Sequence, residues 1–380
     1  MSFDPFTEEH QAFRRTVREY VERELAPHGR EWDEKGEFPR SLFRTFGEMG
    51  WFGIRRDAAH GGSGLDWWYV VAYAEELARC RNAGLATSML VHGEMAIPVI
   101  DEIGTEEQKR EFLAPAIRGE RIAALAVSEP DAGSDVASIR TTARRDGDDL
   151  VVNGSKMWIT NGARADFLTM AVRTGGEGYG GISLVLFPTD VKGFAVGRKL
   201  EKVGLPSSDT AVLHFEDCRV PARWVLGDLD QGFSHIMVNF QGERLVAAVQ
   251  AVAAMTLMLE GALRYGEERK AFGRPVRSFQ AWRHRLADHL AAVEAARWLT
   301  YRACDLFCRN QVAVKEISMA KLYACELAQE VAYDCMQIHG GMGYVLESDI
   351  ARAWRDVRAL TIAGGTSEIM RELVARAEGM

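Results

Sequence analysis

Residues 148–160 read DDLVVNGSKMWIT, and this stretch is the clearest indication of the fold class. Its short apolar runs, broken by Asn153 and Gly154, are typical of a β-strand and too short for a helix. The overlapping stretch RRDGDDL, residues 144–150, carries an Asp-Gly turn of the kind that connects hairpin strands. Similar runs, split by Gly, Asp and Asn, recur between about 122 and 229: RIAALAVS, DFLTMAVRT, ISLVLFPTD, GFAVGRKL and TAVLHFEDCRV. We therefore expect an antiparallel β domain over residues 122–229.

Helical patterns flank this β domain on both sides. The first, TEEHQAFRRTVREYVERELAP, begins with Thr7 as N-cap and acidic residues in its first turn. After residue 230, three long segments repeat apolar residues with a helical period, and segments of that length pack best as an antiparallel bundle. The predicted class is α+β, with a helical domain at 1–121, the β domain at 122–229 and a helical bundle at 230–380.

Composition excludes several classes of function. The net charge is −8 and no basic stripe is visible, which argues against a nucleic-acid partner. The first residues, MSFDPFTEEHQAF, lack the basic and apolar regions of a signal peptide, and we expect no membrane span. The six cysteines are scattered without a CxxC, and the histidines form no cluster. We expect a cytoplasmic protein with reduced thiols and no metal site.

Two stretches of the β domain point to a ligand. They are VSEPDAGSD at 127–135 and NGSKMWITNG at 153–162, and each places hydroxyl residues and glycines where a backbone can approach a ligand. Trp158 and Thr160 alternate with Ile159, so on a strand they would share one face and suit a flat, polar-edged ring. Taken singly, each stretch is explained somewhat better by an ordinary loop and a core tryptophan. No GxSxG, GxxxxGKS/T or strand-linked dinucleotide motif offers another chemistry.

Taken together, the two stretches resemble the flavin-binding signatures of the acyl-CoA dehydrogenase family. Three further stretches resemble other signatures of that family, in the same order: ERKAFGRPVRSFQA at 268–281, QIHGGMGY at 337–344 and GGTSEI at 364–369. The resemblance covers nearly the whole chain. It implies an N-terminal helical domain, a middle antiparallel β domain and a C-terminal four-helix bundle. It also implies non-covalent FAD in the cleft between the β domain and the bundle.

The resemblance assigns residues to this FAD. Those placed at the flavin and thioester are Val127, Ser128, Gly133, Ser134, Trp158, Ile159 and Thr160. Trp158 would pack against the ring, and Thr160 would lie near N5. Those placed at the pyrophosphate and adenine of a neighbouring subunit's FAD are Arg269, Phe272, Gln280, Gln337, Gly340 and Gly341. Thr366 and Glu368 would contact the FAD of their own subunit. Because two chains would share each site, a homo-oligomer is implied, usually a tetramer.

The implied reaction is the α,β-dehydrogenation of an acyl-CoA thioester to the trans-2-enoyl-CoA. A base removes the α-proton while the β-hydrogen leaves as hydride to flavin N5. In most of the family the base is a Glu directly before the Gly-Thr-Ser of the last signature, where this chain has Gly364. A minority branch, including isovaleryl- and long-chain-type enzymes, carries it directly before an Arg on the first long helix of the bundle. The stretch QGERL at 241–245 places Glu243 there, and we expect Glu243 to be the catalytic base.

The helical neighbours of Glu243 support this role. Three and four residues away lie Asn239, Phe240, Val246 and Ala247. Three of them are apolar, which would raise the pKa of the carboxyl group, although the Asn239 amide would favour the charged form. The alternative is a buried ion pair between Glu243 and a distant arginine. The residues expected at the substrate are Ser134, Phe240, Arg244 and Gly364, and Arg244 could equally form a salt bridge within the bundle.

The electron acceptor implied by the resemblance is an electron-transferring flavoprotein. Three alternatives share some of these features: a dehydrogenase of an acyl or aminoacyl group on a carrier protein, a flavin oxidase or monooxygenase, and a non-catalytic scaffold that keeps FAD for stability. A protein-docking surface at the cleft mouth would favour the first. Rapid reaction of the reduced enzyme with oxygen would favour the second, and a flavin that no thioester bleaches would favour the third. Acyl chain length is left open by the sequence.

Overall fold

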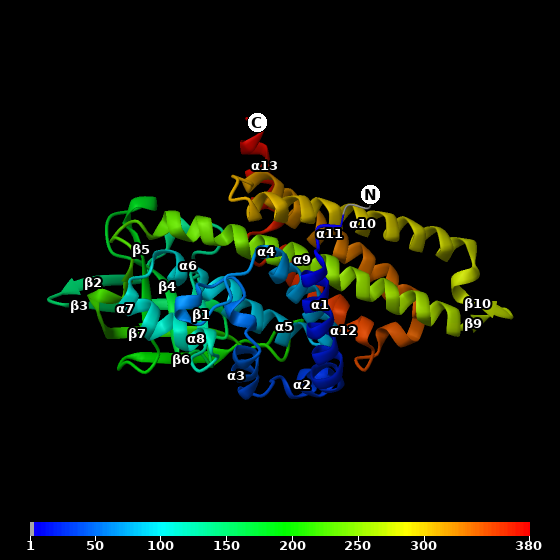
Figure 1. Ribbon diagram of the computed structural model, residues 1–380, viewed down its shortest axis with the longest axis horizontal. Coiled ribbons are helices and arrows are strands. Elements are labelled where there is room, and N and C mark those ends of the chain that lie inside the picture. The colour runs from blue at the N-terminus through cyan, green and yellow to red at the C-terminus, as the bar shows by residue number, and fades with distance from the viewer. Residues whose placement is uncertain (1–3) are drawn as a thin grey trace.

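Helices, a β-sheet and a second set of helices follow one another along the chain (Figure 1). The computed structural model describes residues 4–380. The N-terminal helices are α1 (Glu8–Tyr20), α2 (Gly29–Lys35), α3 (Ser41–Glu48), α4 (Trp67–Leu77), α5 (Ala83–Leu90), α6 (Pro98–Ile103), α7 (Glu106–Gln108) and α8 (Ala114–Ile117). Tighter or wider turns extend several of them, among them η1 (Val21–Leu25), η5 (Ala78–Cys80), η6 (Val91–Ala96) and η7 (Lys109–Leu113). The predicted order of helical, β and helical parts is confirmed.

Local side-chain caps explain where the first helices begin. The Thr7 side chain accepts a hydrogen bond from His10 N at 3.3 Å, and Thr7 N donates to His10 Nδ1 at 3.0 Å, which forms a reciprocal cap at the start of α1. Asp66 caps α4 in a similar way, because Trp68 N donates to Asp66 Oδ1 at 2.8 Å. Thr7 was the N-cap that the sequence predicts.

The β domain is a single sheet with the strand order β6-β7-β3-β2-β4-β5-β8, and β1 pairs with β4. The strands are β1 (Ala123–Ala126), β2 (Thr142–Asp146), β3 (Asp149–Thr160), β4 (Phe167–Arg173), β5 (Ile182–Pro188), β6 (Phe194–Lys199), β7 (Thr210–Pro221) and β8 (Val225–Leu226). The Asp-Gly hairpin is present, since β2 ends at Asp146 and β3 begins at Asp149. The expected antiparallel pattern needs one correction: β1 and β2 each pair with β4 in parallel. Neither is joined to β4 by a hairpin, and a longer connection permits parallel neighbours.

The C-terminal part contains three long helices and two short ones. They are α9 (Gly232–Glu268), α10 (Gln280–Cys308), α11 (Val314–Ile338), α12 (Asp349–Asp356) and α13 (Ser367–Ala377). The fourth member of the expected bundle is therefore short, and α13 packs against α11. A hairpin that the sequence reading missed, β9 (Lys270–Ala271) with β10 (Arg274–Pro275), joins α9 to α10. Figure 1 shows α9 running from the β domain at one end of the molecule to this hairpin at the other.

Two hydrophobic cores hold these parts together. One joins the N-terminal helices to the bundle and includes Phe43, Trp67, Leu245 and Val331. The other fills the sheet and receives Ile236 from the first turns of α9. Because α9 enters both cores, its residues near 239–244 lie where the helices and the sheet meet. Trp67 and Trp68 are buried, as expected for core residues.

The expectation that the chain has no membrane span is not tested by the structure, but two of its helices bear on it. Two helical segments of the described chain, Ala83–Ile103 and Gly232–Glu268, are long and apolar enough to do so. Of their most apolar windows, 83% and 61% are buried inside the protein. A core helix passes the same test, because it is apolar around most of its circumference. The two segments are therefore weak evidence for membrane insertion.

Candidate active site

Glu243 lies on α9 with its side chain almost completely buried. Asn239 Nδ2, one turn earlier, donates to Glu243 Oε1 at 2.9 Å and to the carbonyl oxygen of Met95 in η6 at 2.9 Å. Burial raises the pKa of Glu243 to about 8, although the Arg244 charge and the Asn239 hydrogen bond both oppose this shift. A carboxyl group with such a pKa can exchange a proton near neutral pH.

The buried ion pair that was the alternative for Glu243 is not formed. Within residues 4–380, no basic side chain comes within the 4.0 Å of a salt bridge to its carboxylate. Arg244 points elsewhere, and its Nε donates to the carbonyl oxygen of Gly364 at 3.2 Å. The carboxylate is thus buried without a paired cation, which is typical of functional rather than structural carboxylates.

Two buried cations hold the glycine loop that precedes α13. Arg244 binds the carbonyl of Gly364, and Lys321 Nζ of α11 donates to the carbonyl of Gly365 at 2.6 Å. Both glycines have positive φ, 67° and 101°. No atom lies within 4 Å of the point where a Cβ on Gly364 would stand, so this side of the loop faces open space. The loop is therefore fixed from two helices and adjoins the Glu243 segment of α9.

Thr366 and Glu368 continue this loop into α13. The Thr366 side chain caps the helix by accepting from Ile369 N at 3.4 Å. Glu368 is exposed in the first turn, and its own backbone N–H, followed by Thr366, lowers the pKa of its carboxyl group. A capped helix start offers N–H groups and a positive dipole end to an anionic ligand.

A buried ion pair that the sequence reading missed joins the two motifs of the β domain. Lys156 Nζ donates to Glu129 Oε1 at 2.8 Å and to the carbonyl of Val127 at 2.9 Å. Glu129 Oε2 in turn accepts from Arg140 N at 2.6 Å. Burial lowers the pKa of Lys156 to about 8. Burial also acts to raise the pKa of Glu129, but the Lys156 charge and the hydrogen bonds from Lys156, Thr141 and Arg140 together lower it. The inward orientation of Lys156 could have been predicted from the strand pattern. Lys156 lies four residues after Val152, so the two share one face of the strand, and both are buried.

Trp158 has an unusual backbone for a bulky residue. Its φ is +66°, and the pairing of β3 with β7 shifts between Lys156 and Ile159. The residue is 59% exposed. Strain of this kind persists only where surrounding contacts impose it, and it is common at binding sites. An indole held out of the core in this way is available to stack on a ligand.

The remaining residues predicted at the flavin divide into two groups. Ser128 and Thr160 are half-buried, and Gly133 and Ser134 are exposed, with no atom within 4 Å of a Cβ on Gly133. Val127 and Ile159, by contrast, place their side chains in the sheet core. The predicted ligand contacts of Val127 and Ile159 can therefore involve only their backbone atoms. The physical reason is that Ile159 occupies an inward-facing position of β3, and Val127 directly follows β1 with its side chain in the same core.

Phe240 connects the α9 segment to the sheet. Its half-buried ring packs against the sheet core, one turn before Glu243. The Arg244 guanidinium lies 5.7 Å from the centre of the same ring. Phe240, Glu243, Arg244 and Gly364 therefore form one connected group. The assignment of these four residues to a substrate site stays a prediction.

Six predicted residues lie at the other end of the bundle. They are Arg269, Phe272, Gln280, Gln337, Gly340 and Gly341. The Tyr265 and His339 rings stack 4.4 Å apart and bring their two segments together. Figure 1 shows the β9–β10 hairpin at the far end of α9 from the sheet, so the structure does not bring these residues to the site of their own chain. Phe272, at the hairpin turn, is 96% exposed.

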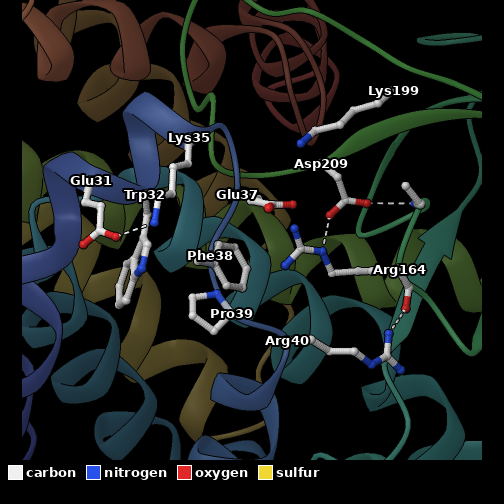
Figure 2. A pocket seen from close by; sticks show the side chains of 11 residues that line it. Glu31, Trp32, Lys35, Glu37, Phe38, Pro39, Arg40, Arg164, Lys199 and Asp209 are labelled. Carbon is white, nitrogen blue, oxygen red and sulfur yellow. Dashed lines mark hydrogen bonds and ion pairs between the residues drawn. The ribbon is translucent and has the colours of Figure 1, made fainter.

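A surface pocket of about 490 Å³ is shown in Figure 2. Each of its cations already has a partner: Lys35 binds Glu31, Arg40 binds Asp166, Arg164 binds Asp209, and Lys199 Nζ donates to the Gly36 carbonyl. Satisfied charges leave little to attract a ligand. Among residues 4–380, no group of three His, Cys, Asp or Glu is arranged to hold a metal ion. All six cysteines are free thiols, and all but Cys308 are buried.

Comparisons with known proteins cover nearly the whole chain. Three family models match: "Acyl-CoA dehydrogenase, N-terminal domain" at residues 7–120, "middle domain" at 124–218 and "C-terminal domain" at 230–379. The long-chain specific acyl-CoA dehydrogenase of Sus scrofa mitochondria is 41% identical over 98% of this chain and 86% of the relative. A probable acyl-CoA dehydrogenase from Mycobacterium abscessus superimposes with a TM-score of 0.96 at 42% identity, covering 98% and 99% of the two chains. A Mycobacterium smegmatis glutaryl-CoA dehydrogenase in complex with FADH2 gives 0.93 at 30%, covering 98% and 95%.

Proposed function

The chain belongs to the acyl-CoA dehydrogenase family of FAD-dependent oxidoreductases, and from this premise we propose that it dehydrogenates an acyl-CoA thioester with Glu243 as the α-proton base. The observation that carries the assignment of the base is the buried Glu243 carboxyl group, with a pKa of about 8 and no basic partner within salt-bridge distance among residues 4–380. Gly364, at the position where most of the family has its base, offers no group that can take a proton.

The residues present fit FAD. The exposed indole of Trp158 offers a flat surface, and the open space at Gly133 lets a ligand approach the backbone of the first motif. The N-terminus of α13, with Thr366 as its cap, can receive an anionic group. When bound, FAD accepts the β-hydrogen of the substrate together with its electron pair. We assign Ser128, Trp158 and Thr160 to the ring.

The proton step falls to one oxygen atom of Glu243. Oε1 already accepts from Asn239, whereas Oε2 makes no hydrogen bond within residues 4–380. We assign the removal of the α-proton to Oε2. Asn239 holds the carboxylate plane, because its amide is anchored at the same time to the carbonyl of Met95. The raised pKa makes the carboxylate basic enough for a weakly acidic C–H group.

The rate should depend on pH with the sign set by this raised pKa. Only the carboxylate form can accept a proton, so kcat/KM should rise about tenfold per pH unit below about 8 and level off above it. In Asn239→Ala, a hydrogen bond to the charged form is lost, and the midpoint should move to higher pH. Steady-state kcat/KM, measured from about pH 6 to about pH 10, would test both statements. A flat profile, or a midpoint that falls in Asn239→Ala, would contradict them.

Trp158→Ala should weaken FAD binding more than it destabilises the fold. The ring would lose a stacking surface worth about 1 kcal/mol beyond its buried area, or roughly fivefold in affinity or more. The protein itself should lose little stability, because Trp158 is mostly exposed and alanine at the same left-handed backbone carries a similar strain. FAD affinity by fluorescence titration and the melting temperature of the apoprotein separate the two effects. Unchanged affinity with a sharply lower melting temperature would identify Trp158 as a core residue instead.

The function is tested by anaerobic bleaching of the bound flavin with a panel of thioesters. We expect acyl-CoA thioesters to bleach it, and the same acyl groups on a carrier protein to do so more slowly. Electron-transferring flavoprotein should then reoxidise the reduced protein faster than oxygen does. Bleaching only by carrier-bound substrates, or rapid reaction with oxygen, would establish one of the alternative functions. A flavin that no thioester bleaches would overturn the assignment altogether.

We also propose a homo-oligomer in which FAD sites are completed by a second chain. The support is the position of Arg269, Phe272 and Gln280, which lie at the end of the bundle away from the sheet of their own chain. A solvent-facing Phe272 is explained if another subunit covers it. A tetramer and a cytoplasmic location stay predictions. Light scattering that found a monomer with full FAD content would contradict the shared site.

A further inference from the structure

A lysine to which the mechanism above gives no role lies beside the glycine loop that precedes α13. Lys321 of α11 is fully buried, with 0% of its surface exposed. Its Nζ atom makes one hydrogen bond, which it donates to the carbonyl oxygen of Gly365 at 2.6 Å. Among residues 4–380, no carboxylate comes within the 4.0 Å of a salt bridge to it. Burial lowers the pKa of this ammonium group, and the charge of Arg244 acts in the same direction.

This position is unfavourable for an ammonium group if only the stability of the fold is considered. A buried ammonium group loses its water, and one neutral acceptor replaces only part of that hydration. Its neighbours one turn away on α11, which include Ile317, Ala324 and Cys325, are buried as well. An apolar side chain of similar length would therefore suit the position. A buried charge without an acidic partner is more typical of functional sites than of structural ones.

The backbone of the loop indicates what Lys321 controls. The peptide bond between Gly365 and Thr366 is trans, so its N–H points opposite to its carbonyl. Because Lys321 binds that carbonyl, the N–H of Thr366 is directed away from α11. Arg244 holds the preceding peptide in the same way, through the carbonyl of Gly364. In the part of the chain that the structure describes, neither the Gly365 N–H nor the Thr366 N–H has an acceptor.

These two N–H groups are suited to an anionic oxygen atom. A cation bound at a carbonyl polarises the peptide, so the N–H on its other side becomes a stronger donor. The Thr366 N–H also lies at the start of α13, where the helix dipole favours negative charge. Strong, unpaired donors of this kind bind charged oxygen atoms better than neutral ones. The loop therefore has both the donors and the positive charge for an anionic group of a ligand.

We propose that Lys321 is a positioning residue, which acts through the Gly365 carbonyl to direct the Thr366 N–H at an anionic oxygen atom of a bound ligand. Two ligands of the proposed reaction carry such an atom. One is the diphosphate of FAD, and the other is the thioester oxygen, which gains negative charge as the α-proton leaves. The inference thus rests on the function proposed above. Lys321 itself touches neither ligand, because none of its surface is exposed.

Lys321→Met removes the hydrogen bond and the charge, and two measurements identify the ligand. If the anionic atom belongs to the diphosphate, FAD should bind the apoprotein at least about tenfold more weakly in a fluorescence titration. If it is the thioester oxygen, FAD affinity should stay unchanged, and anaerobic single-turnover bleaching by saturating octanoyl-CoA should slow at least about tenfold. Lys321→Arg keeps the charge and the N–H donors, so it should retain most of the affinity or rate that Lys321→Met loses.

A merely structural role for Lys321 would give different results. Lys156→Met is the matched comparison, because Lys156 is also fully buried but pairs with Glu129. Lys321→Met leaves no carboxylate without its cation, so its apoprotein should melt close to the wild-type temperature, whereas Lys156→Met should melt well below it. The pH midpoint of kcat/KM should also stay unchanged, because burial and the direct neighbours of Glu243, rather than Lys321, set the pKa of that carboxyl group.

The outcomes separate this proposal from the proposed function. Wild-type FAD affinity together with a wild-type bleaching rate in Lys321→Met would overturn the positioning role. A fall in melting temperature as large as that of Lys156→Met would make Lys321 a structural residue, and a displaced pH midpoint would mean that it acts on the charge of Glu243. If no acyl-CoA bleaches the wild-type flavin, the proposed function fails, and the FAD titration still decides whether Lys321 serves the diphosphate.

Discussion

Replacing Glu243 with glutamine is expected to slow substrate oxidation by roughly 100- to 10,000-fold, the usual range for the loss of a general base. Glutamine has nearly the same shape as glutamate, and Asn239 and Met95 can still bind each other. FAD content, thioester affinity and melting temperature should therefore stay close to those of the wild type. Because the lost interaction acts only during proton removal, kcat and kcat/KM should fall together in steady-state assays.

Gly364 provides the matched comparison for this variant. Gly364→Ala should be much milder than Glu243→Gln, because no proton acceptor is lost. Its φ of +67° makes any side chain there cost about 1–2 kcal/mol, while open space surrounds the Cβ position. Gly364→Glu in the Glu243→Gln background should thus fold and restore part of the rate from the other side of the site. If Gly364→Ala were as damaging as Glu243→Gln, backbone position rather than proton transfer would explain both.

Lys156→Met is expected to cause the largest loss of stability, about 3–5 kcal/mol, because it leaves the Glu129 carboxylate buried without its cation. The pair ties NGSKMWITNG to VSEPDAGSD through the carbonyl of Val127, so FAD should also be released more readily. Thermal unfolding and FAD content, measured on the same preparations, report the two effects.

The double variant Lys156→Met/Glu129→Leu is the control for charge. Removing both partners leaves no unpaired buried charge, so much of the lost stability should return. FAD binding should recover less, because two hydrogen bonds that position the first motif are gone: Lys156 no longer donates to the Val127 carbonyl, and Glu129 no longer accepts from Arg140 N. A single variant Lys156→Met as stable as the wild type would show that the pair contributes nothing to the fold.

Periodic and local signals made much of the fold predictable. The change from helical to strand period near 122 marks the sheet, and Thr7 caps the first helix as its position predicts. The apolar neighbours of Glu243 on α9 predicted its burial, and Asn239 bonds to it as anticipated. These features depend on residues close in sequence, where spacing translates directly into geometry.

Long-range pairings could not be read in the same way. Glu129 and Lys156 meet only because the loop that follows β1 lies against β3. The parallel pairing of β1 with β4 likewise depends on how distant strands are arranged. The left-handed backbone of Trp158 arises from a bulge against β7, which no local preference of tryptophan would indicate. The segment α5–η6 was overlooked, although Asn82 caps it and its Met95 carbonyl anchors Asn239. Its uniformly apolar sequence lacks the amphipathic period that reveals surface helices.

The central claim, that Glu243 removes the α-proton, is tested most directly by single-turnover flavin bleaching. Wild type and Glu243→Gln, each loaded with FAD, are mixed anaerobically with saturating acyl-CoA, which separates the chemical step from substrate binding and reoxidation. We predict a bleaching rate at least about 100-fold lower in the variant, with equal FAD and thioester occupancy. Bleaching at the wild-type rate in Glu243→Gln would exclude Glu243 as the base and contradict this account of the site.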